Sequence, residues 1–532
     1  MVAPAVTPEH PGPEPVPSTH RRRPWPVLAR VLVAAAAGGL WYVSYPPRTA
    51  WWLAPVAFAL LAAVLRHRRA RAGFGYGLVF GLAFVLPLLS WLQDFLGADF
   101  GPLPWAGLSL VVALYMAVSG AAMAVVSTLR GGPVWMAALF IAGEVLRTRW
   151  PLNGFPWGKV GYGQPEGAFL PLAALGGTAL LGLAVVLTGT GLAELVARLR
   201  ARAGRRALIA PLVFTLAPVL AGLAAAPLVT TDAQNGTRTV VIVQGNAPND
   251  GMNLLYDTPI LRANHLAATR TLIADIKAGK IAKPDLVVWP ETVVDLPPDS
   301  ARDSELADLV HQLGVPLLVG ARHYLNPTTV QNTVQVWDPV TGPGPSYAKQ
   351  ELVPFAEYVP LRSISAAVTP FVADTRDMIP GSGPGALPTT GTVVGAAICY
   401  EIAYEQVVSE TVAAGAQLLL VPTNNAWYGP GEMSYQQLAM SRVSAVEFGR
   451  AVAVAATSGV SAVVEPDGSV SQQTSLFTAQ TLVARVPLRS TATLATRLGA
   501  WPEWVVSALG LAALVLATGT RIARRRARTG RA

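Results

Sequence analysis

The chain has few of the residues that build disulfide frameworks and metal sites. Its 532 residues include one cysteine, Cys399, and six histidines. A single thiol forms no disulfide within the chain and no cysteine-based metal site. The histidines also lack the spacing of metal ligands. They are His10, His20, His67, His265, His311 and His323. We therefore expect no metal and no other cofactor.

Charge is also scarce. Only 13% of the residues are charged and 52% are hydrophobic, whereas a soluble globular chain carries about 25% charged residues. The mean hydropathy is +0.42, which indicates a protein embedded in a membrane. A net charge of +9 is also typical of proteins that bind nucleic acid. However, the arginines stand in short clusters between apolar runs, a pattern typical of membrane topology, so we expect no nucleic-acid partner.

Apolar stretches of membrane-spanning character occur at both ends of the chain. Each is near the length that crosses roughly 30 Å of hydrocarbon. They are residues 27–45, 50–65, 74–96, 103–129, 133–146, 168–197, 207–229 and 501–520. The first stretch has the character of a signal peptide too. The long Pro-rich tail before it and the six stretches after it favour an uncleaved helix.

The arginines predict the orientation. They gather in alternate loops, around residues 21–23, 66–71, 130, 198–206 and 521–531. The other loops carry only Arg48, Arg147, Arg149 and Lys159. The positive-inside rule places the arginine-rich set in the cytoplasm, although an Arg-rich tail taken alone is also compatible with simple disorder.

This pattern predicts a multi-pass protein of the cell (plasma) membrane with both termini in the cytoplasm. The expected parts are a disordered cytoplasmic tail (1–26), a seven-span membrane domain (27–229), an extracytoplasmic domain (230–495), a C-terminal transmembrane helix (496–520) and a basic cytoplasmic tail (521–532).

The segment 235–490 reads as an α/β domain, because short β-rich runs alternate with helical periodicity. The predicted strands are 239–244, 286–289, 315–319, 333–337, 393–399, 417–421 and 451–455, with a hairpin formed by 461–464 and 469–472. The predicted helices are 262–278, 304–313, 404–414 and 435–447.

Three residues in this domain have the chemistry of a nucleophilic site. Glu291 closes one strand-like run, Lys349 opens a turn segment and Cys399 ends another apolar run. A carboxylate accepts the thiol proton, the thiol attacks an acyl carbon and an ammonium favours the thiolate and stabilises the oxyanion. Each residue also has a simpler interpretation: a buried thiol, a solvated loop carboxylate and an exposed turn lysine.

The order Glu, Lys, Cys and the residues around it resemble the nitrilase (carbon–nitrogen hydrolase) superfamily. The motifs are VWPE at 288–291, KQELVPFAE at 349–357 and CYE at 399–401. The apolar stretches and further motifs narrow the resemblance to the apolipoprotein N-acyltransferase family. These are GFPW at 154–157, GY at 161–162, VQGN at 243–246, NNAWYG at 424–429 and EFGR at 447–450.

The resemblance implies a site and a fold. It places the catalytic triad on Glu291, Lys349 and Cys399, with Glu357 as a supporting glutamate that orients Lys349. Glu401 is an accessory position, or else a carboxylate that stabilises a helix start. The implied fold is a multi-pass α-helical membrane domain joined to a nitrilase-like four-layer α-β-β-α sandwich outside the membrane.

The resemblance also implies the substrates, which are a phospholipid acyl donor and the α-amino group of a diacylglyceryl-cysteine apolipoprotein. We expect a monomer and an acyl-thioester intermediate. A Pro-rich loop, 354–380, has apolar residues that include Phe355, Tyr358 and Phe371. We interpret it as a lid in which Phe355 and Tyr358 bind substrate, the alternative being ordinary packing. Residues 249–253 depart from the family pattern, so we assign no acceptor-binding residue there.

Two other functions compete with acyl transfer. One is a membrane-tethered amidase or nitrilase-type hydrolase, in which water is the second nucleophile. The other is a non-enzymatic membrane scaffold for a polyprenol-phosphate glycosyltransferase. The predicted membrane anchor and the GFPW motif favour lipid substrates, and the presence of all three triad residues argues against a scaffold.

Overall fold

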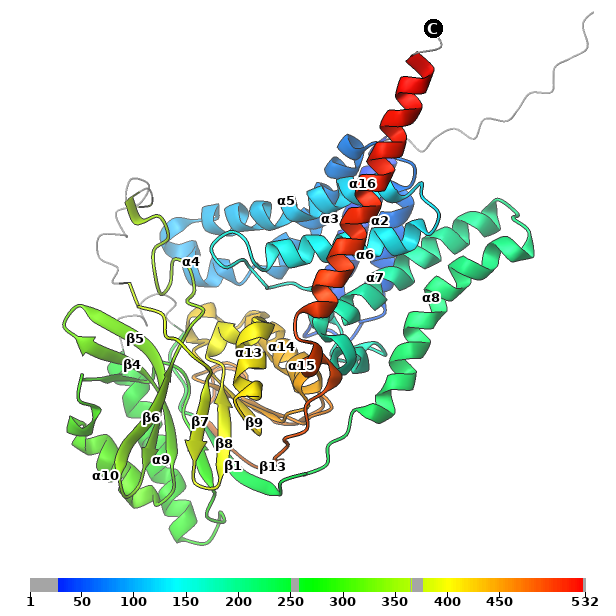
Figure 1. Cartoon of the computed structure of the whole chain (residues 1–532). Coiled ribbons are helices and arrows are strands. Elements are labelled where there is room, and N and C mark those ends of the chain that lie inside the picture. Colours follow the sequence, from blue (N-terminus) through cyan, green and yellow to red (C-terminus); the bar gives the residue numbers. More distant parts are fainter. Residues whose placement is uncertain (1–26, 250–257, 364, 366–376, 530–532) are drawn as a thin grey trace, which may run out of the picture.

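A computed structural model describes residues 27–249, 258–363, 365 and 377–529. A bundle of apolar helices stands on one side of an α/β domain, and α16 rises along the bundle (Figure 1). The expectations for the tail 1–26, for residues 250–253 and for Phe371 concern positions outside the described residues.

The helical part contains a helix at each predicted apolar stretch. These helices are α1 Val27–Val43, α2 Leu53–Leu65, α3 Ala70–Leu88, α5 Leu103–Val126, α6 Gly132–Arg147, α7 Ala173–Arg200, α8 Arg205–Ala225 and α16 Trp501–Thr529. Among the described residues, five helices are long and apolar enough to cross a membrane, namely α3, α5, α7, α8 and α16. The 13 residues of α2 extend only about 20 Å, so α2 is short for a complete span.

The predicted stretch 74–96 is divided by the structure. Helix α3 ends at Leu88, one residue after Pro87, and a separate helix, α4 Leu92–Phe100, follows. Because α4 carries polar residues such as Asp94, it does not continue the apolar helix. It lies between the bundle and the α/β domain (Figure 1), where the Phe95 ring stacks on Trp427 with centroids 6.0 Å apart.

Two mixed sheets form the centre of the α/β domain. The first has the order β13-β1-β2-β4-β5-β6, with β3 paired to β4. Its strands are β1 Thr237–Gln244, β2 Leu286–Val288, β3 Val294–Leu296, β4 Leu317–Asn326, β5 Thr329–Asp338, β6 Gly342–Ala348 and β13 Gln480–Pro487. The second has the order β12-β11-β10-β9-β8-β7. Its strands are β7 Ala386–Thr389, β8 Thr392–Ala396, β9 Leu418–Thr423, β10 Val452–Ala456, β11 Ala462–Val464 and β12 Val470–Gln473.

The central strands of each sheet are parallel and are buried on both faces. In β1, Val240 and Ile242 face the core between the sheets, while Val241 and Val243 face the outer helices. This is why β1 reads as a continuous apolar run and not as an alternating one. Strand β9 shows the same division in the second sheet, since Leu418 and Leu420 line the inter-sheet core while Leu419 and Val421 face the helices on the other side.

Helices complete four layers, as the family resemblance implies. Helices α9 Thr258–Lys277 and α10 Ser304–Leu313 cover the first sheet. Helices α13 Glu405–Ala413 and α14 Met433–Phe448 cover the second sheet on the side of the apolar bundle (Figure 1). The predicted elements of this domain are present, and β3, β6, β7, β13 and the short α15 Leu494–Leu498 are additional to them.

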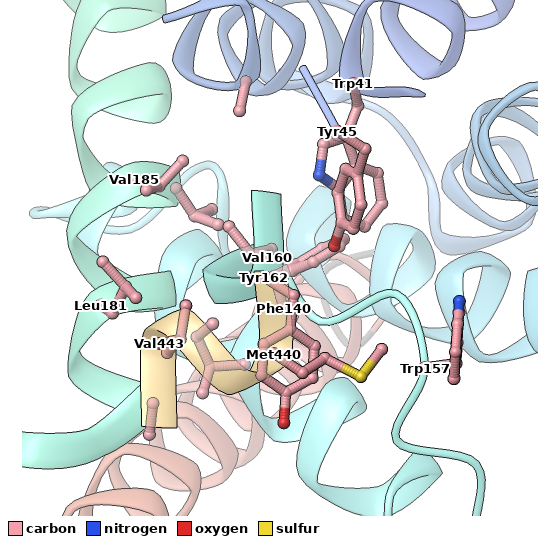
Figure 2. Packing of buried hydrophobic residues seen from close by; sticks show 14 of the residues in the cluster. Trp41, Tyr45, Phe140, Trp157, Val160, Tyr162, Leu181, Val185, Met440 and Val443 are labelled. Atoms are coloured by element: carbon pink, nitrogen blue, oxygen red, sulfur yellow. The ribbon is translucent and has the colours of Figure 1, made fainter. Parts of the chain in front are cut away.

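The bundle and the α/β domain share one apolar core. Figure 2 shows Met440 and Val443 of α14 packed with residues of the bundle, among them Phe140 and Leu181. The Gly154–Trp157 motif lies in this junction. The Trp157 indole N–H donates to Gln436 Oε1 at 2.7 Å, and its ring stacks on Tyr400, next to Cys399. The segment that contains Cys399 is therefore packed directly on the bundle.

Candidate active site

The structure brings Glu291, Lys349 and Cys399 together at one edge of the two sheets. Glu291 follows β2, Lys349 follows β6 and Cys399 follows β8. Carboxyl ends of strands that run in the same direction meet at one edge of a sheet, where loops carry functional side chains. A single small cavity is lined by all three residues.

Lys349 lies between two carboxylates. Its Nζ atom is 2.9 Å from Glu291 Oε1 and 3.1 Å from Glu357, and its side chain is only 1% exposed. Burial alone lowers the pKa of Lys349, but Glu291 and Glu357 more than offset this and raise the pKa well above its usual value. Lys349 is therefore a fixed cation, and the structure places Glu357, the supporting glutamate implied by the family resemblance, in contact with it.

Asn332 joins the same two carboxylates from strand β5. Its Nδ2 atom donates to Glu291 Oε1 at 2.7 Å and to Glu357 Oε1 at 2.6 Å. The backbone N–H of Asn424 donates to Glu291 Oε2 at 2.8 Å. Sequence reasoning missed both roles. For Asn332, the signal that could have been used is an amide side chain within a strand-like run. The structure shows this residue to be only 2% exposed.

Cys399 opens the 3₁₀ turn Cys399–Ala403 with a positive φ of 54°. The predicted strand 393–399 consequently ends at Ala396. Burial raises the pKa of the Cys399 thiol to about 12, Glu291 adds to this rise, and Lys349 only partly opposes it. Lys349 thus lowers the pKa of Cys399, as the sequence argument expects, but by less than burial and Glu291 raise it. Cys399 rests as a thiol at neutral pH, and its reaction requires transfer of the proton.

Glu401 contacts the backbone next to Lys349 and next to Cys399, and not Cys399 Sγ or Lys349 Nζ themselves. Its Oε1 accepts from the Gln350 N–H at 2.6 Å and from the Tyr347 hydroxyl at 2.8 Å. Its Oε2 accepts from the Ile398 N–H at 2.7 Å, which caps the turn that starts at Cys399. Glu401 thus caps the turn that begins at Cys399, and its bonds to Gln350 and Tyr347 tie this turn to the segment that carries Lys349.

The cavity beside Cys399 is small. Its volume is about 40 Å³, enough for a few water molecules and not for an acyl chain. Apolar lining comes from Val353, Ala356, Met378, Trp427 and Tyr428. Phe355 and Tyr358, the predicted substrate-binding residues, are not among the lining residues. Phe355 is 59% exposed and has a positive φ of 66°, so it points out of the fold.

The two-sheet sandwich and its edge site define a carbon–nitrogen hydrolase domain, and the model of the carbon–nitrogen hydrolase family matches residues 251–496. The model of the apolipoprotein N-acyltransferase N-terminal domain matches residues 37–191. An apolipoprotein N-acyltransferase from Mycolicibacterium smegmatis is 36% identical, with 91% of this chain and 85% of the relative covered. One from Azotobacter vinelandii is 33% identical, with 93% and 95% covered. The chain belongs to the apolipoprotein N-acyltransferase family.

Solved structures similar to part of the chain include an amidase of the nitrilase superfamily from Nesterenkonia AN1. It is 19% identical, covers 50% of this chain and 94% of its own length, and has a TM-score of 0.35. Membership of the family and the apolar helices make the chain a membrane protein. They favour lipoprotein N-acylation over the hydrolase and the scaffold that the sequence left open.

Proposed function

We propose that this protein transfers a fatty acyl chain from a membrane phospholipid to the α-amino group of the N-terminal diacylglyceryl-cysteine of apolipoproteins. Glu291 is the general base, Cys399 the nucleophile and Lys349 the oxyanion-stabilising cation. The observation that carries the proposal is the buried contact of Lys349 with Glu291 and Glu357 beside the lone thiol, in a chain of this family.

The first half-reaction forms a thioester. The Cys399 thiol gives its proton to the Glu291 carboxylate as Sγ attacks the ester carbon of the phospholipid. Lys349 Nζ stabilises the negative charge that develops on the carbonyl oxygen. When the tetrahedral intermediate collapses, the bond to the glycerol oxygen breaks and Glu291 returns the proton to that oxygen. Lysophospholipid leaves and the acyl group remains on Cys399.

The second half-reaction moves the acyl group to nitrogen. Glu291 removes a proton from the acceptor amine as the nitrogen attacks the thioester carbon, and Cys399 leaves and recovers its proton. Two lipid substrates crowd one site when bound together, so a ping-pong sequence lets the first product leave before the acceptor enters. The apolar lining by Trp427 and Tyr428 limits hydrolysis of the thioester.

We further propose that the loop 354–380 is a lid that contacts the acyl chain through Phe355 and Tyr358. Support comes from the size of the cavity, because an acyl chain needs more room than about 40 Å³. The loop lines the cavity through Ala356 and Met378, so its movement is the direct way to enlarge that space.

The orientation is also a proposal. We propose that the protein is a monomer whose domain 230–495 faces away from the cytoplasm, with the tail 1–26, the membrane domain 27–229, the helix 496–520 and the tail 521–532 arranged as the arginines predict. Reporter fusions after Asp232 and after Arg528 are expected to report opposite sides of the membrane. The same side for both contradicts the eight-span arrangement.

Mass spectrometry of the protein incubated with phospholipid alone tests the mechanism. The peptide that contains Cys399 is expected to gain one acyl mass that neutral hydroxylamine removes. Cys399→Ala is expected to gain no acyl mass and to transfer nothing to a lipoprotein. The chain has no other cysteine, so thioester chemistry in the variant has no substitute thiol. Full transfer by Cys399→Ala refutes the proposal.

A further inference from the structure

Two polar side chains contact the Cys399 sulfur from the side of the second sheet. The Thr423 hydroxyl, at the end of β9, is 3.1 Å from Cys399 Sγ. The amide Nε2 of Gln437, on α14, is 3.6 Å from the same atom. Both residues are buried. They come from elements other than those of Glu291 and Lys349, and the mechanism above gives them no task.

The orientation of the Gln437 amide is set by its neighbours. Its Oε1 atom accepts from the Thr423 hydroxyl at 3.0 Å and from Asn425 Nδ2 at 3.0 Å. Two donors on Oε1 require that the Nε2 donor is directed at Cys399. Asn425 also supplies a second donor to Oε1, so that oxygen keeps a partner when the Thr423 hydroxyl turns away.

A developing thiolate needs such donors because the Cys399 sulfur is buried. Glu291 and Glu357 share the cation Lys349, and transfer of the thiol proton to Glu291 leaves this group of three without net charge. A sulfur anion beside this group is disfavoured by burial, and the group supplies no net positive charge that offsets this cost. Lys349 Nζ directs its hydrogen bonds to the carboxylates of Glu291 and Glu357.

We propose that Thr423 is a further catalytic residue, which donates a hydrogen bond to the Cys399 sulfur as negative charge develops there, and that Gln437 is its positioning partner and a second donor. This inference rests on the proposed function, in which Cys399 is the nucleophile.

The proton changes are balanced. In the resting site Cys399 keeps its proton, and the Thr423 hydroxyl donates to Gln437 Oε1. As Glu291 takes the thiol proton, the hydroxyl rotates so that its one proton points at sulfur, while Oε1 retains Asn425. When the thiolate leaves in the second half-reaction, the same hydroxyl stabilises it until Glu291 returns the proton. Thr423 itself neither gains nor loses a proton.

Three variants separate this role from packing. Thr423→Val keeps the shape of the side chain and removes the hydroxyl. Thr423→Ser keeps the hydroxyl and removes a methyl group, so it is the matched control. Gln437→Glu keeps an acceptor for Thr423 and Asn425 but replaces the donor to sulfur by an oxygen.

The measurement is the rate of alkylation of the full chain in detergent by iodoacetamide as a function of pH. Cys399 is the only thiol, so the incorporated label reports this residue alone. We expect alkylation of Thr423→Val to be roughly tenfold slower below the thiol pKa, which corresponds to about 1.4 kcal/mol, with a normal maximum at high pH. Thr423→Ser is expected within about twofold of the original chain, and Gln437→Glu is expected to be slower than it.

Each result is decisive. An unchanged pH profile in Thr423→Val, or equal slowing in Thr423→Ser, overturns the inference. If thermal unfolding shows that Thr423→Val does not fold, Gln437→Glu decides, and an unchanged profile there overturns it as well. Alkylation needs no lipid and no turnover. Failure of this inference is therefore distinct from failure of the proposed function, which Cys399→Ala tests by acyl transfer.

Discussion

Replacement of Glu401 by glutamine is the sharpest test of how the site is held together. The carboxylate presents acceptors to the Gln350 N–H and the Tyr347 hydroxyl through Oε1, and to the Ile398 N–H through Oε2. Glutamine has the same shape but only one acceptor oxygen. Whichever way the amide lies, an NH₂ group faces a backbone N–H at the other position.

The magnitude follows from this count. One buried donor is left unsatisfied, which costs about 1–3 kcal/mol. The two facing N–H groups separate, and either the Cys399 turn or the segment before Glu351 shifts. A shift of about 1 Å in a reacting group costs roughly 10²-fold in rate. We therefore expect Glu401→Gln to fold with lowered stability and to acylate Cys399 about 10²-fold more slowly.

The assay is the rate at which phospholipid alone adds an acyl mass to Cys399, together with a thermal unfolding curve in detergent. Glu410→Gln is the matched control, since Glu410 lies on the neighbouring helix α13 and its side chain is exposed. It is expected to behave like the original chain. An acylation rate of Glu401→Gln equal to that of the control refutes the idea that this carboxylate positions the site.

Three further predictions follow from the described contacts. Lys349→Arg is expected to lower the acylation rate by roughly 10²-fold or more, measured by the same assay, because a planar guanidinium does not fit between two carboxylates that hold a compact ammonium; near-normal turnover returns Lys349 to a structural role. Burial lowers the pKa of His265 to about 4, so its contribution to the free energy of unfolding is complete above about pH 6.5 and decreases by about 3 kcal/mol as the pH falls to 4. In thermal unfolding measured as a function of pH, His265→Gln should lose this part of the decline in stability. An identical decline in both chains contradicts the prediction. Phe355→Ala with Tyr358→Ala is expected to impair use of a long-chain phospholipid more than of a short-chain soluble ester, and equal impairment indicates packing alone.

Much of the fold is predictable from local patterns. The strands and helices of residues 235–490 are present where the residues predict them, because runs such as Val240–Val243 are apolar enough to be buried on both faces. The third apolar stretch is an exception. Its hydropathy hides the break after Pro87, and the contacts of Phe95 with Trp427 and Tyr428 explain why α4 turns toward the α/β domain.

By itself, the sequence determined which residues carry reactive groups. Its one thiol, the order of Glu291, Lys349 and Cys399, and the motifs around them define the chemistry and the family, because these are properties of residue type and spacing. The tertiary structure decided what those groups do at rest. The pKa of Cys399 depends on burial. The hydrogen bonds that Asn332 donates to two carboxylates, and the one that Glu401 accepts from Ile398, hold the site together. Burial and contacts between distant segments are not encoded by any local pattern.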